Sequence, residues 1–593
     1  MSGSSLSYRN LGLHERFCVS RHKLGEPPIV SLVAKIEGRL CQEIEDSFKR
    51  RVSELLLILP VLSCRISESD SSKPKFRRVQ DELGPDDIYR SVDHPIFKSE
   101  VQPSFSCASS RILSEEIHSL GRVDIELGPL WRLTTYPSHA EKSFYVALTV
   151  HHVISDGQGS SNLLKTFLQD DLPTRELLTG GTEDCMPPIS DQTEDMRPRL
   201  TFLLPIIFRE IVLPKLPSFL SCWFDSGKTW PYFDVEDSIA RCSNPSTRKK
   251  FRGNLNKKPI ECLEKGRKVV HLSGKGLLAD LKRESKRIGV TTLHPVLHSC
   301  IMVSLISSLS QEIENVPISG GEGVPDVAEA NTVEGTESEA KRNRVRPLNL
   351  RSETPISIRK PLESKHGLCH GNFVADLEYS KSFELPTRGG ECLSDQLETF
   401  HRLTLDYDHR LNSESGRRES LYNMGMLGYI PNGEKGPSSA EVEDRSWTGW
   451  ERYFYEKSKG ERPFRSSFGI SNLGRFDPLP SERQKTDVDS GDGGGGNSKG
   501  SISLSGLKPE ALAWSQPPSL TGSALVIDAI GLQGKDDRED CLTLVVCWRK
   551  GCLEDGLVET FVEKLGNLVH LVAGKMGPGI ESQDTISQIS QRI

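Results

Sequence analysis

Two histidines, an aspartate and a glycine follow a strand-like apolar run, and together these residue types could carry out acid–base chemistry. The run is Phe144–Val150, and the sequence His-His-Val-Ile-Ser-Asp-Gly occupies residues 151–157. A residue directly after a strand lies at the mouth of a sheet, where an imidazole can take a proton from a hydroxyl or an amine. His152 is therefore the candidate general base. His151 is expected to have a structural role, because adjacent side chains at a strand end point to opposite faces.

Asp156 and Gly157 narrow the interpretation of this histidine pair. A short acid four residues after His152 can fold back and brace the turn, and glycine can adopt a positive φ there. The pair alone is equally well explained by neutral, hydrogen-bonded histidines at a strand end. His152 and Asp156 could also face one metal ion, but no third and fourth ligand stand nearby at the spacing of a zinc site. No metal site is predicted.

The His-x-x-x-Asp-Gly pattern resembles the signature of the CoA-dependent acyltransferase superfamily, which includes chloramphenicol acetyltransferase, plant BAHD enzymes, condensation domains and fungal alcohol acetyltransferases. Further segments resemble other elements of that superfamily and follow in its order. They are Gly128-Pro129-Leu130-Trp131-Arg132-Leu133 before the histidines, and Pro355-Ile356-Ser357-Ile358-Arg359, Gly371-Asn372-Phe373-Val374 and Phe468-Gly469-Ile470-Ser471-Asn472-Leu473-Gly474 after them.

The last of these segments, with the aromatic-rich run that ends at Phe464, is most similar to the fungal alcohol acetyltransferase branch. The Asp-Phe-Gly-Trp-Gly motif of the plant BAHD group is absent from the sequence, which disfavours that branch. The similarity extends over about residues 8–570. It implies an α/β fold of two pseudo-equivalent chloramphenicol-acetyltransferase-like domains, each a mixed sheet flanked by helices, with the active site between them.

The resemblance implies transfer of an acetyl or other short acyl group from acetyl-CoA or another acyl-CoA to a small alcohol, without a bound cofactor. His152 would be the general base. The carboxylate of Asp156 would turn toward an arginine, for which Arg359 is the candidate by its place in the motif order. Ser471 or Asn472 would donate to the developing oxyanion, and Asn472 could equally be an amide that locks a strand.

Other functions remain open at this point. The acceptor could be an amine, or the acyl chain could be long, as in wax-ester synthases. The chain could also be a catalytically degenerate member of the superfamily, or a condensation-like module that meets a carrier protein. The intact His152, Asp156 and Gly157 argue against degeneracy, and the absence of adjoining carrier or adenylation segments argues against an assembly-line module.

The composition excludes one class of partner and favours a reducing compartment. The 593 residues carry 75 basic and 82 acidic side chains, a net charge of -7 with the two signs interspersed, so no basic face for nucleic acid is expected. The 14 cysteines include no Cys-x-x-Cys pair, and neither a signal-peptide core nor an apolar run of ~18 residues is present. We therefore expect an intracellular, cytoplasmic protein with free thiols. A monomer is expected as well.

Two stretches show the same strand-then-helix pattern and predict two halves. In the first, residues 29–36 are strand-like and apolar residues then recur at helical spacing to Leu56; in the second, a strand at 269–272 precedes two helices. The predicted parts are an N-terminal half at 1–200, a crossover at 201–265 and a C-terminal half at 266–593. The last strand is predicted at 542–548 and the last helix at 557–571. Disordered insertions are predicted at about 311–349 and 477–518.

The segment 202–223 is apolar but interrupted by prolines and charges, so it cannot span a bilayer as a regular helix. It is either a crossover packed against the protein's own sheets or a surface patch that contacts lipid. The second interpretation would place the protein peripherally at the endoplasmic reticulum or at lipid droplets, close to hydrophobic alcohols.

Overall fold

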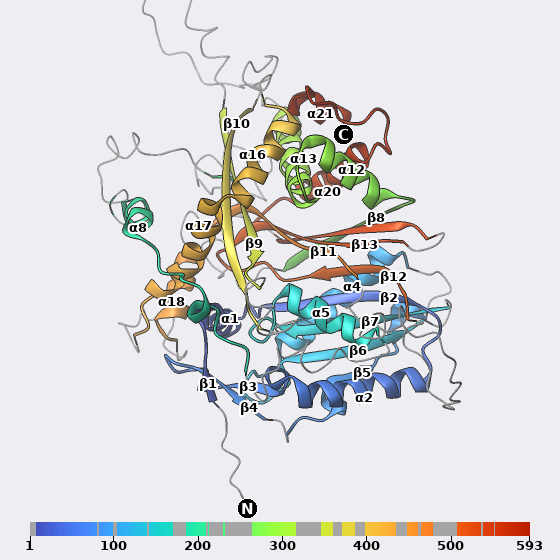
Figure 1. Ribbon diagram of the computed structural model, residues 1–593, viewed down its shortest axis with the longest axis vertical. Coiled ribbons are helices and arrows are strands. Elements are labelled where there is room, and N and C mark those ends of the chain that lie inside the picture. Colours follow the sequence, from blue (N-terminus) through green and yellow to red (C-terminus); the bar gives the residue numbers. More distant parts are fainter. Residues whose placement is uncertain are drawn as a thin grey trace, which may run out of the picture.

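The computed structural model consists of two α/β halves stacked along the long axis of the molecule (Figure 1). Most elements from the N-terminal part of the chain, in blue and cyan, form the lower half in that view, and most elements from the C-terminal part form the upper half. This architecture confirms the predicted fold class. The structure describes residues 8–79, 82–98, 103–138, 142–169, 186–208, 212, 229–231, 264–315, 346–359, 371–385, 398–433, 447–459, 464–477, 507–534, 538–550 and 552–593.

A mixed sheet of five strands, in the order β12–β2–β7–β6–β5, forms the centre of the N-terminal half. Its strands pair antiparallel except for β5 and β6, which are parallel. Every residue of β7 is buried, which explains why this strand reads as a continuous apolar run. The strands are β12 (Pro509–Ser515), β2 (Ile29–Glu37), β7 (Ser143–His151), β6 (Trp131–Pro137) and β5 (Tyr89–Ser91).

A six-stranded sheet in the order β10–β9–β11–β13–β14–β8 forms the centre of the C-terminal half. β11 is parallel to both of its neighbours, and the other pairs are antiparallel. The strands are β10 (Val374–Leu385), β9 (Arg346–Ser357), β11 (Ser466–Arg475), β13 (Ser523–Leu532), β14 (Asp540–Arg549) and β8 (Lys265–Gly274). β8 and β14 confirm the strands predicted in this half. A small third sheet joins β1 (Tyr8–Asn10), β4 (Lys75–Arg78) and β3 (Cys64–Ser67).

Helices cover these sheets, and α2, α12, α13 and α20 lie where the sequence predicts helices. The N-terminal half holds α1 (Leu13–Lys23), α2 (Gln42–Ile58), α3 (Pro85–Ile88), α4 (Phe105–Gly121), α5 (Gly157–Phe167), α7 (Ser190–Thr193) and α8 (Leu200–Ile207). The C-terminal half holds α12 (Leu277–Ile288), α13 (His294–Asn315), α16 (Phe400–Asn412), α17 (Glu414–Gly425), α18 (Gly449–Ser458), α20 (Asp555–Val572) and α21 (Ile586–Arg592).

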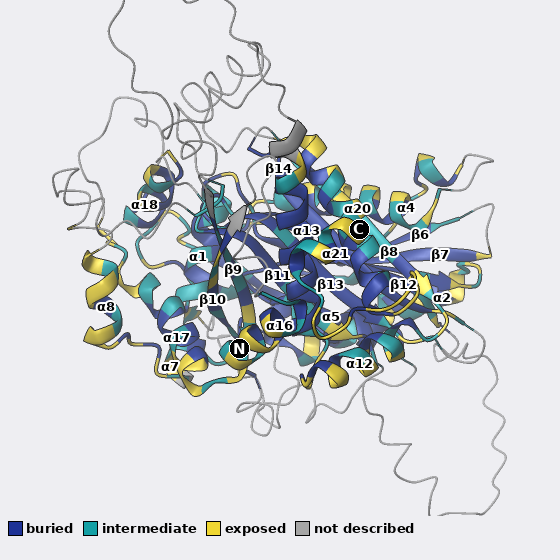
Figure 2. Ribbon diagram, turned by 90° about the horizontal axis from the view of Figure 1, so that it is seen from above, coloured by how far each residue is buried: buried dark blue, intermediate teal, exposed yellow. Residues whose placement is uncertain are grey.

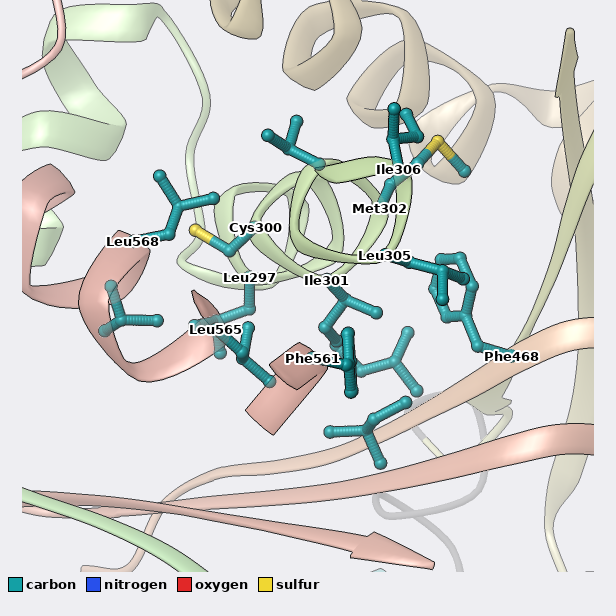
Figure 3. Close-up of a cluster of buried hydrophobic side chains, with 14 of the residues drawn as sticks. Leu297, Cys300, Ile301, Met302, Leu305, Ile306, Phe468, Phe561, Leu565 and Leu568 are labelled. Atoms are coloured by element: carbon teal, nitrogen blue, oxygen red, sulfur yellow. The ribbon is translucent and has the colours of Figure 1, made fainter. Parts of the chain in front are cut away.

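Helix α13 is the centre of the C-terminal core. Figure 3 shows its apolar side chains between α20, which contributes Leu565 and Leu568, and Phe468 of β11. Helix α13 begins at His294. Pro295 then falls in the first turn, where a missing N–H removes no helical hydrogen bond.

Strand β12 is the main departure from the predicted organisation. It lies inside the segment 477–518, which was predicted to be a disordered insertion, and it pairs antiparallel with β2 at the edge of the N-terminal sheet. Its Trp514 is 1% exposed and donates a hydrogen bond of 2.8 Å to the carbonyl of Ala529 in β13. The C-terminal part of the chain therefore contributes a strand to the N-terminal sheet. Residues 478–506 lie outside the described part.

The first predicted insertion also begins and ends differently. Helix α13 continues to Asn315 and β9 already begins at Arg346, so both ends of the segment 311–349 belong to regular elements. The residues between them, 316–345, lie outside the described part. Of the crossover at 201–265, the structure describes α8 and a few residues on either side of the remaining gaps. Among the described helices, none combines the length and the apolar content that crossing a bilayer requires.

A separate apolar cluster lies between the two sheets and holds the halves together. Helix α4 contributes Ile112 and Leu113, the N-terminal sheet contributes Ala147, and β14 contributes Val545 and Cys547. Figure 2 shows the corresponding concentration of buried residues in the strands and helices at the centre of the molecule. Burial of this kind is non-directional, so the exact placement of the site depends on polar contacts across the same boundary.

Replacing Trp514 by Ala should lower the free energy of unfolding by about 3–5 kcal/mol, because a large cavity would open and the carbonyl of Ala529 would lose its donor. Urea unfolding followed by circular dichroism measures the change. Leu57, a side chain of α2 that is 61% exposed, provides the control, since its replacement by Ala should change stability by no more than about 0.5 kcal/mol. Equal effects at both positions would contradict a structural role for β12.

Candidate active site

The end of β7 and the segment around Leu130 place the two histidines of the motif. His151 is the last residue of β7, and its backbone N–H donates to the carbonyl of Leu130 over 2.7 Å. The N–H of His152 donates to the carbonyl of Pro28, also over 2.7 Å. The segment that resembles the Pro-Leu-Trp element therefore holds the strand end that carries the candidate base.

A residue from the C-terminal half determines which nitrogen of His152 carries the proton. The side-chain Nδ2 of Asn372 donates to the carbonyls of His152 (2.5 Å) and Val153 (3.0 Å). Its Oδ1 is thereby directed at the Nδ1 of His152, 2.8 Å away, and can only accept. Nδ1 of His152 is therefore protonated, and Nε2 carries the lone pair.

Asp156 turns away from His152 and pairs with Arg359, as the sequence predicts. Its Oδ2 lies 2.6 Å from Nη1 of Arg359, and both side chains are 1% exposed. The same oxygen accepts from the N–H of Phe373 (3.0 Å), and Oδ1 accepts from the N–H of Gly159 (2.9 Å) and caps α5. Burial opposes ionisation, but the charge of Arg359 and these hydrogen bonds outweigh it and hold the pKa of Asp156 below its usual value.

Gly157 opens helix α5, and its backbone there does not need the conformational freedom of glycine. It is the first residue of α5 and is not among the described glycines with positive φ. A Cβ at this position would lie 3.0 Å from Cδ2 of Leu473 and 3.3 Å from Cζ3 of Trp514. The expectation of a positive φ was wrong; a side chain here would instead crowd Leu473 of β11 and Trp514 of β12, which glycine avoids.

His151 and His152 have different neighbours, as expected for a strand end. Nδ1 of His151 accepts from the N–H of Val153 (3.1 Å), so its Nε2 carries the proton and points at Nδ1 of His22, 3.2 Å away. Burial, with repulsion from His22, lowers the pKa of His151 well below its usual value. His151 is thus a neutral, fully engaged side chain in the wall of the site.

Helix α1 brings two further side chains to His152 that the sequence analysis did not find. The ring centroids of His14 and His152 are 5.0 Å apart, and Sγ of Cys18 lies 4.0 Å from Nδ1 of His14. Potential ligand atoms of these three residues all lie within 4.8 Å of one another. The sequence analysis argued that no third ligand lies near His152. That argument was wrong, because it considered only residues that are close along the chain and not those brought near by folding. Asp156, in contrast, faces Arg359.

The two oxyanion candidates lie on β11, whose Leu473 contacts the start of α5 as described above. Asn472 is occupied: its Oδ1 accepts from the N–H of Gly474 (2.8 Å), and its Nδ2 lies 3.5 Å from Nδ1 of His294. These contacts favour the strand-locking interpretation of Asn472. Within the described part of the chain, the hydroxyl of Ser471 has no hydrogen-bond partner.

Burial sets the protonation state of the candidate base. It lowers the pKa of His152 from the usual value, while the negative charge of Asp156 opposes that change. At neutral pH the imidazole is therefore neutral. A neutral imidazole with a protonated Nδ1 and an open Nε2 is able to accept a proton from a bound hydroxyl or amine.

Comparison with known proteins bears on the fold. No family model matches the chain, and no curated protein matches its sequence. Among solved structures, it is similar to the condensation domain from the monacolin K polyketide synthase MokA, with a TM-score of 0.50 and 10% identity over 97% of this chain and 99% of that one. It is also similar to the trichothecene 15-O-acetyltransferase TRI3 from Fusarium sporotrichioides, with a TM-score of 0.49 and 9% identity over 95% and 96%. The condensation domain thus shares the two-half fold over essentially the whole chain.

Replacing Asp156 by Asn should lower the free energy of unfolding by about 3–5 kcal/mol at neutral pH, because Arg359 would stay buried without its counter-charge. The folded-state pKa of Asp156 is depressed, so its contribution is present above the ordinary carboxyl pKa and is lost as the pH falls through the lower, folded value. The difference between variant and wild type should therefore shrink only in strong acid. Denaturant unfolding over a pH series measures it.

The exposed ion pair of Lys49 with Asp86 serves as the control for this measurement. Removing that carboxylate by Asp86→Asn should lower the free energy of unfolding far less than Asp156→Asn does, because solvent screens the exposed pair. A deficit of the same small size for Asp156→Asn would show that the buried pair does not stabilise the junction of the two halves.

Proposed function

We propose that this protein is an acyltransferase that moves an acetyl or other short acyl group from acyl-CoA to an alcohol, with His152 as general base. The observation that carries the proposal is the hydrogen bond from Nδ1 of His152 to Oδ1 of Asn372, which leaves Nε2 as an open acceptor beside the junction of the two halves. The shared fold with a condensation domain is consistent with this chemistry and does not choose the acceptor.

The proposed reaction needs one proton acceptor and no covalent acyl-enzyme. Nε2 of His152 takes the proton of the acceptor hydroxyl as its oxygen attacks the thioester carbonyl and a C–O bond forms. The tetrahedral intermediate then collapses, the C–S bond breaks, and the same Nε2–H protonates the departing CoA thiolate. Asn372 keeps its acceptor contact with Nδ1 throughout, so it is a positioning residue that holds the ring and its tautomer.

Asp156 is also a positioning residue in this mechanism. Its carboxylate is committed to Arg359, Phe373 and Gly159, so it organises the turn that follows His152 and takes no proton. For the oxyanion, Ser471 is the better of the two candidates, because Asn472 is already engaged by Gly474 and His294.

Two variants of the proposal differ in the substrates. An amine could replace the alcohol, since the same base accepts either proton, and a longer acyl chain could replace the acetyl group. Release of CoA thiol from acetyl-CoA and long-chain acyl-CoA, each with alcohol and amine panels, separates them. We propose that the protein acts as a monomer in the cytoplasm, with acyl-CoA and a small acceptor as its partners and no nucleic acid.

Replacing His152 by Ala should lower acyl transfer by ~10²–10⁴-fold, the usual loss when a general base is removed, without a comparable loss of stability. In the wild type, the rate should fall on acidification only below the ordinary pKa of imidazole, ~6.5, because burial lowers the pKa of His152. Thiol release against pH measures both effects.

His151 provides the matched control, because it is also a buried histidine but is hydrogen-bonded to Val153 and His22. His151→Asn should act mainly through stability and leave the acidic limb of the pH profile in place. An equal loss at the two positions, at equal melting temperatures, would remove His152 from the role of base.

We further propose that α8 contacts a lipid surface. Of the 12 large apolar side chains that are exposed in the described part, five lie between residues 200 and 212. The helix stands out from the body of the protein in Figure 1, and exposed Arg197 and Arg199 precede it, as suits an anionic headgroup region. A peripheral contact at the endoplasmic reticulum or a lipid droplet would bring the enzyme close to hydrophobic acceptors.

The triple change of Leu204, Ile207 and Phe208 to Ser should abolish flotation with anionic liposomes while wild-type protein rises with them, because all three side chains are exposed on or directly after α8. Changing three exposed apolar residues elsewhere, Leu57, Leu127 and Met576, to Ser provides the control and should leave flotation intact. Wild-type protein that stays at the bottom of the gradient at low and moderate salt would refute the contact.

A further inference from the structure

Three side chains capable of binding a soft metal ion converge beside the junction of the halves. His14 and Cys18 stand four residues apart on α1, so both project from the same face of the helix. His152 faces them from the end of β7, and one potential ligand atom of each residue lies within 4.8 Å of the others. Two imidazoles and a thiol form a donor set that suits zinc and related ions.

The hydrogen bonds around His152 favour the same conclusion. A metal-bound histidine commonly donates its second ring N–H to an oxygen that fixes its orientation, and Nδ1 of His152 donates to Oδ1 of Asn372 in this manner. Nε2 is therefore the available ligand atom. His14 is the most exposed of the three side chains, whereas Cys18 is 1% exposed and His152 9%.

We propose that His14, Cys18 and His152 bind a thiophilic divalent ion such as Zn²⁺, and that this ion reversibly blocks acyl transfer by occupying the lone pair of His152. The ion would have three protein ligands and an open fourth position for water. Bond lengths of about 2.0 Å to nitrogen and 2.3 Å to sulfur require the donors to move closer together than 4.8 Å. Because Asn372 holds the ring of His152, the side chains of His14 and Cys18 would have to make this movement.

Binding is an exchange of a proton for a metal ion, with no redox step. The thiol of Cys18 loses its proton to solvent as the sulfur–metal bond forms. Burial raises the pKa of this thiol, and Arg21, one turn further along α1, acts in the opposite direction and favours the thiolate. The ion supplies the remaining stabilisation of the thiolate.

The described residues contain a second cluster of potential metal ligands, but it is not a candidate metal site. Glu353, Asp376 and Glu378 also bring potential ligand atoms together, but Arg465 forms ion pairs with all three. That cluster therefore already contains its cation. In the cluster of His14, Cys18 and His152, the donors are neutral groups facing one another.

Cobalt(II) added to reduced, metal-free protein tests the site without reference to activity. A tetrahedral site with a thiolate ligand gives intense visible bands and a near-ultraviolet charge-transfer band. Both should be lost in His14→Ala, Cys18→Ala and His152→Ala. Cys64→Ala is the matched control, because Cys64 is another buried cysteine of the N-terminal core, and it should keep both bands.

The 14 cysteines of the chain make the difference between wild type and Cys18→Ala the decisive spectrum. A spectrum without a thiolate band, or one that Cys18→Ala retains, would overturn the proposal. Circular dichroism establishes that each variant is folded, and Cys18→Ser and His14→Gln replace any alanine variant that is not.

The inhibitory part rests on the proposed acyl transfer and is measured separately. The zinc concentration that halves the rate of thiol release, relative to each variant's own rate without zinc, should rise at least ~10-fold in His14→Ala and Cys18→Ala and stay unchanged in Cys64→Ala. Cobalt bands without any acyl transfer would refute the proposed function and leave the metal site standing. Acyl transfer without the cobalt bands would refute the metal site and leave the proposed function standing.

Discussion

The buried ion pair between Asp156 and Arg359 is the interaction on which the arrangement of the site depends. It joins the turn after β7 to the segment after β9, and the nearby hydrogen bonds of Asp156 to Phe373 and of Asn372 to His152 cross the same boundary. Apolar burial between the sheets brings the halves together but has no direction. A paired charge is directional, since any displacement leaves it buried without a counter-charge, and it therefore fixes the register of one half against the other.

The candidate base and its supports come from opposite halves, and this division explains how a neutral histidine can be held in one orientation. His152 is placed along the chain by β7, while Asn372 from the other half selects its tautomer. Burial lowers the pKa of the imidazole and so keeps Nε2 free of a proton. The negative charge of Asp156 acts in the opposite direction, but it is paired with Arg359 and does not outweigh burial. The base is thus open at one nitrogen and committed at the other.

Much of this arrangement could be predicted from the sequence, because it is encoded in short segments. The two strand-then-helix patterns and the strand before His152 follow from periodicity. The pairing of Asp156 with Arg359 was expected only from the resemblance to a known superfamily. β12 was missed because its apolar run of four residues, at 511–514, is short and follows a segment rich in Gly and Ser, and only pairing with β2 makes it a strand. His14 and Cys18 were missed for a different reason: nothing in the local sequence of α1 indicates that it packs against the motif.

The same properties that make His152 a good base also make it a good ligand. A base needs a lone pair that is neither protonated nor hydrogen-bonded, and a metal ion needs the same atom in the same state. An enzyme can avoid this conflict by surrounding its base with groups that bind metals poorly. Here α1 presents an imidazole and a thiol to His152, two donors that suit zinc, and the carboxylate of Asp156 is committed to Arg359. The proposed sensitivity to a thiophilic ion would therefore follow from the side chains that face His152.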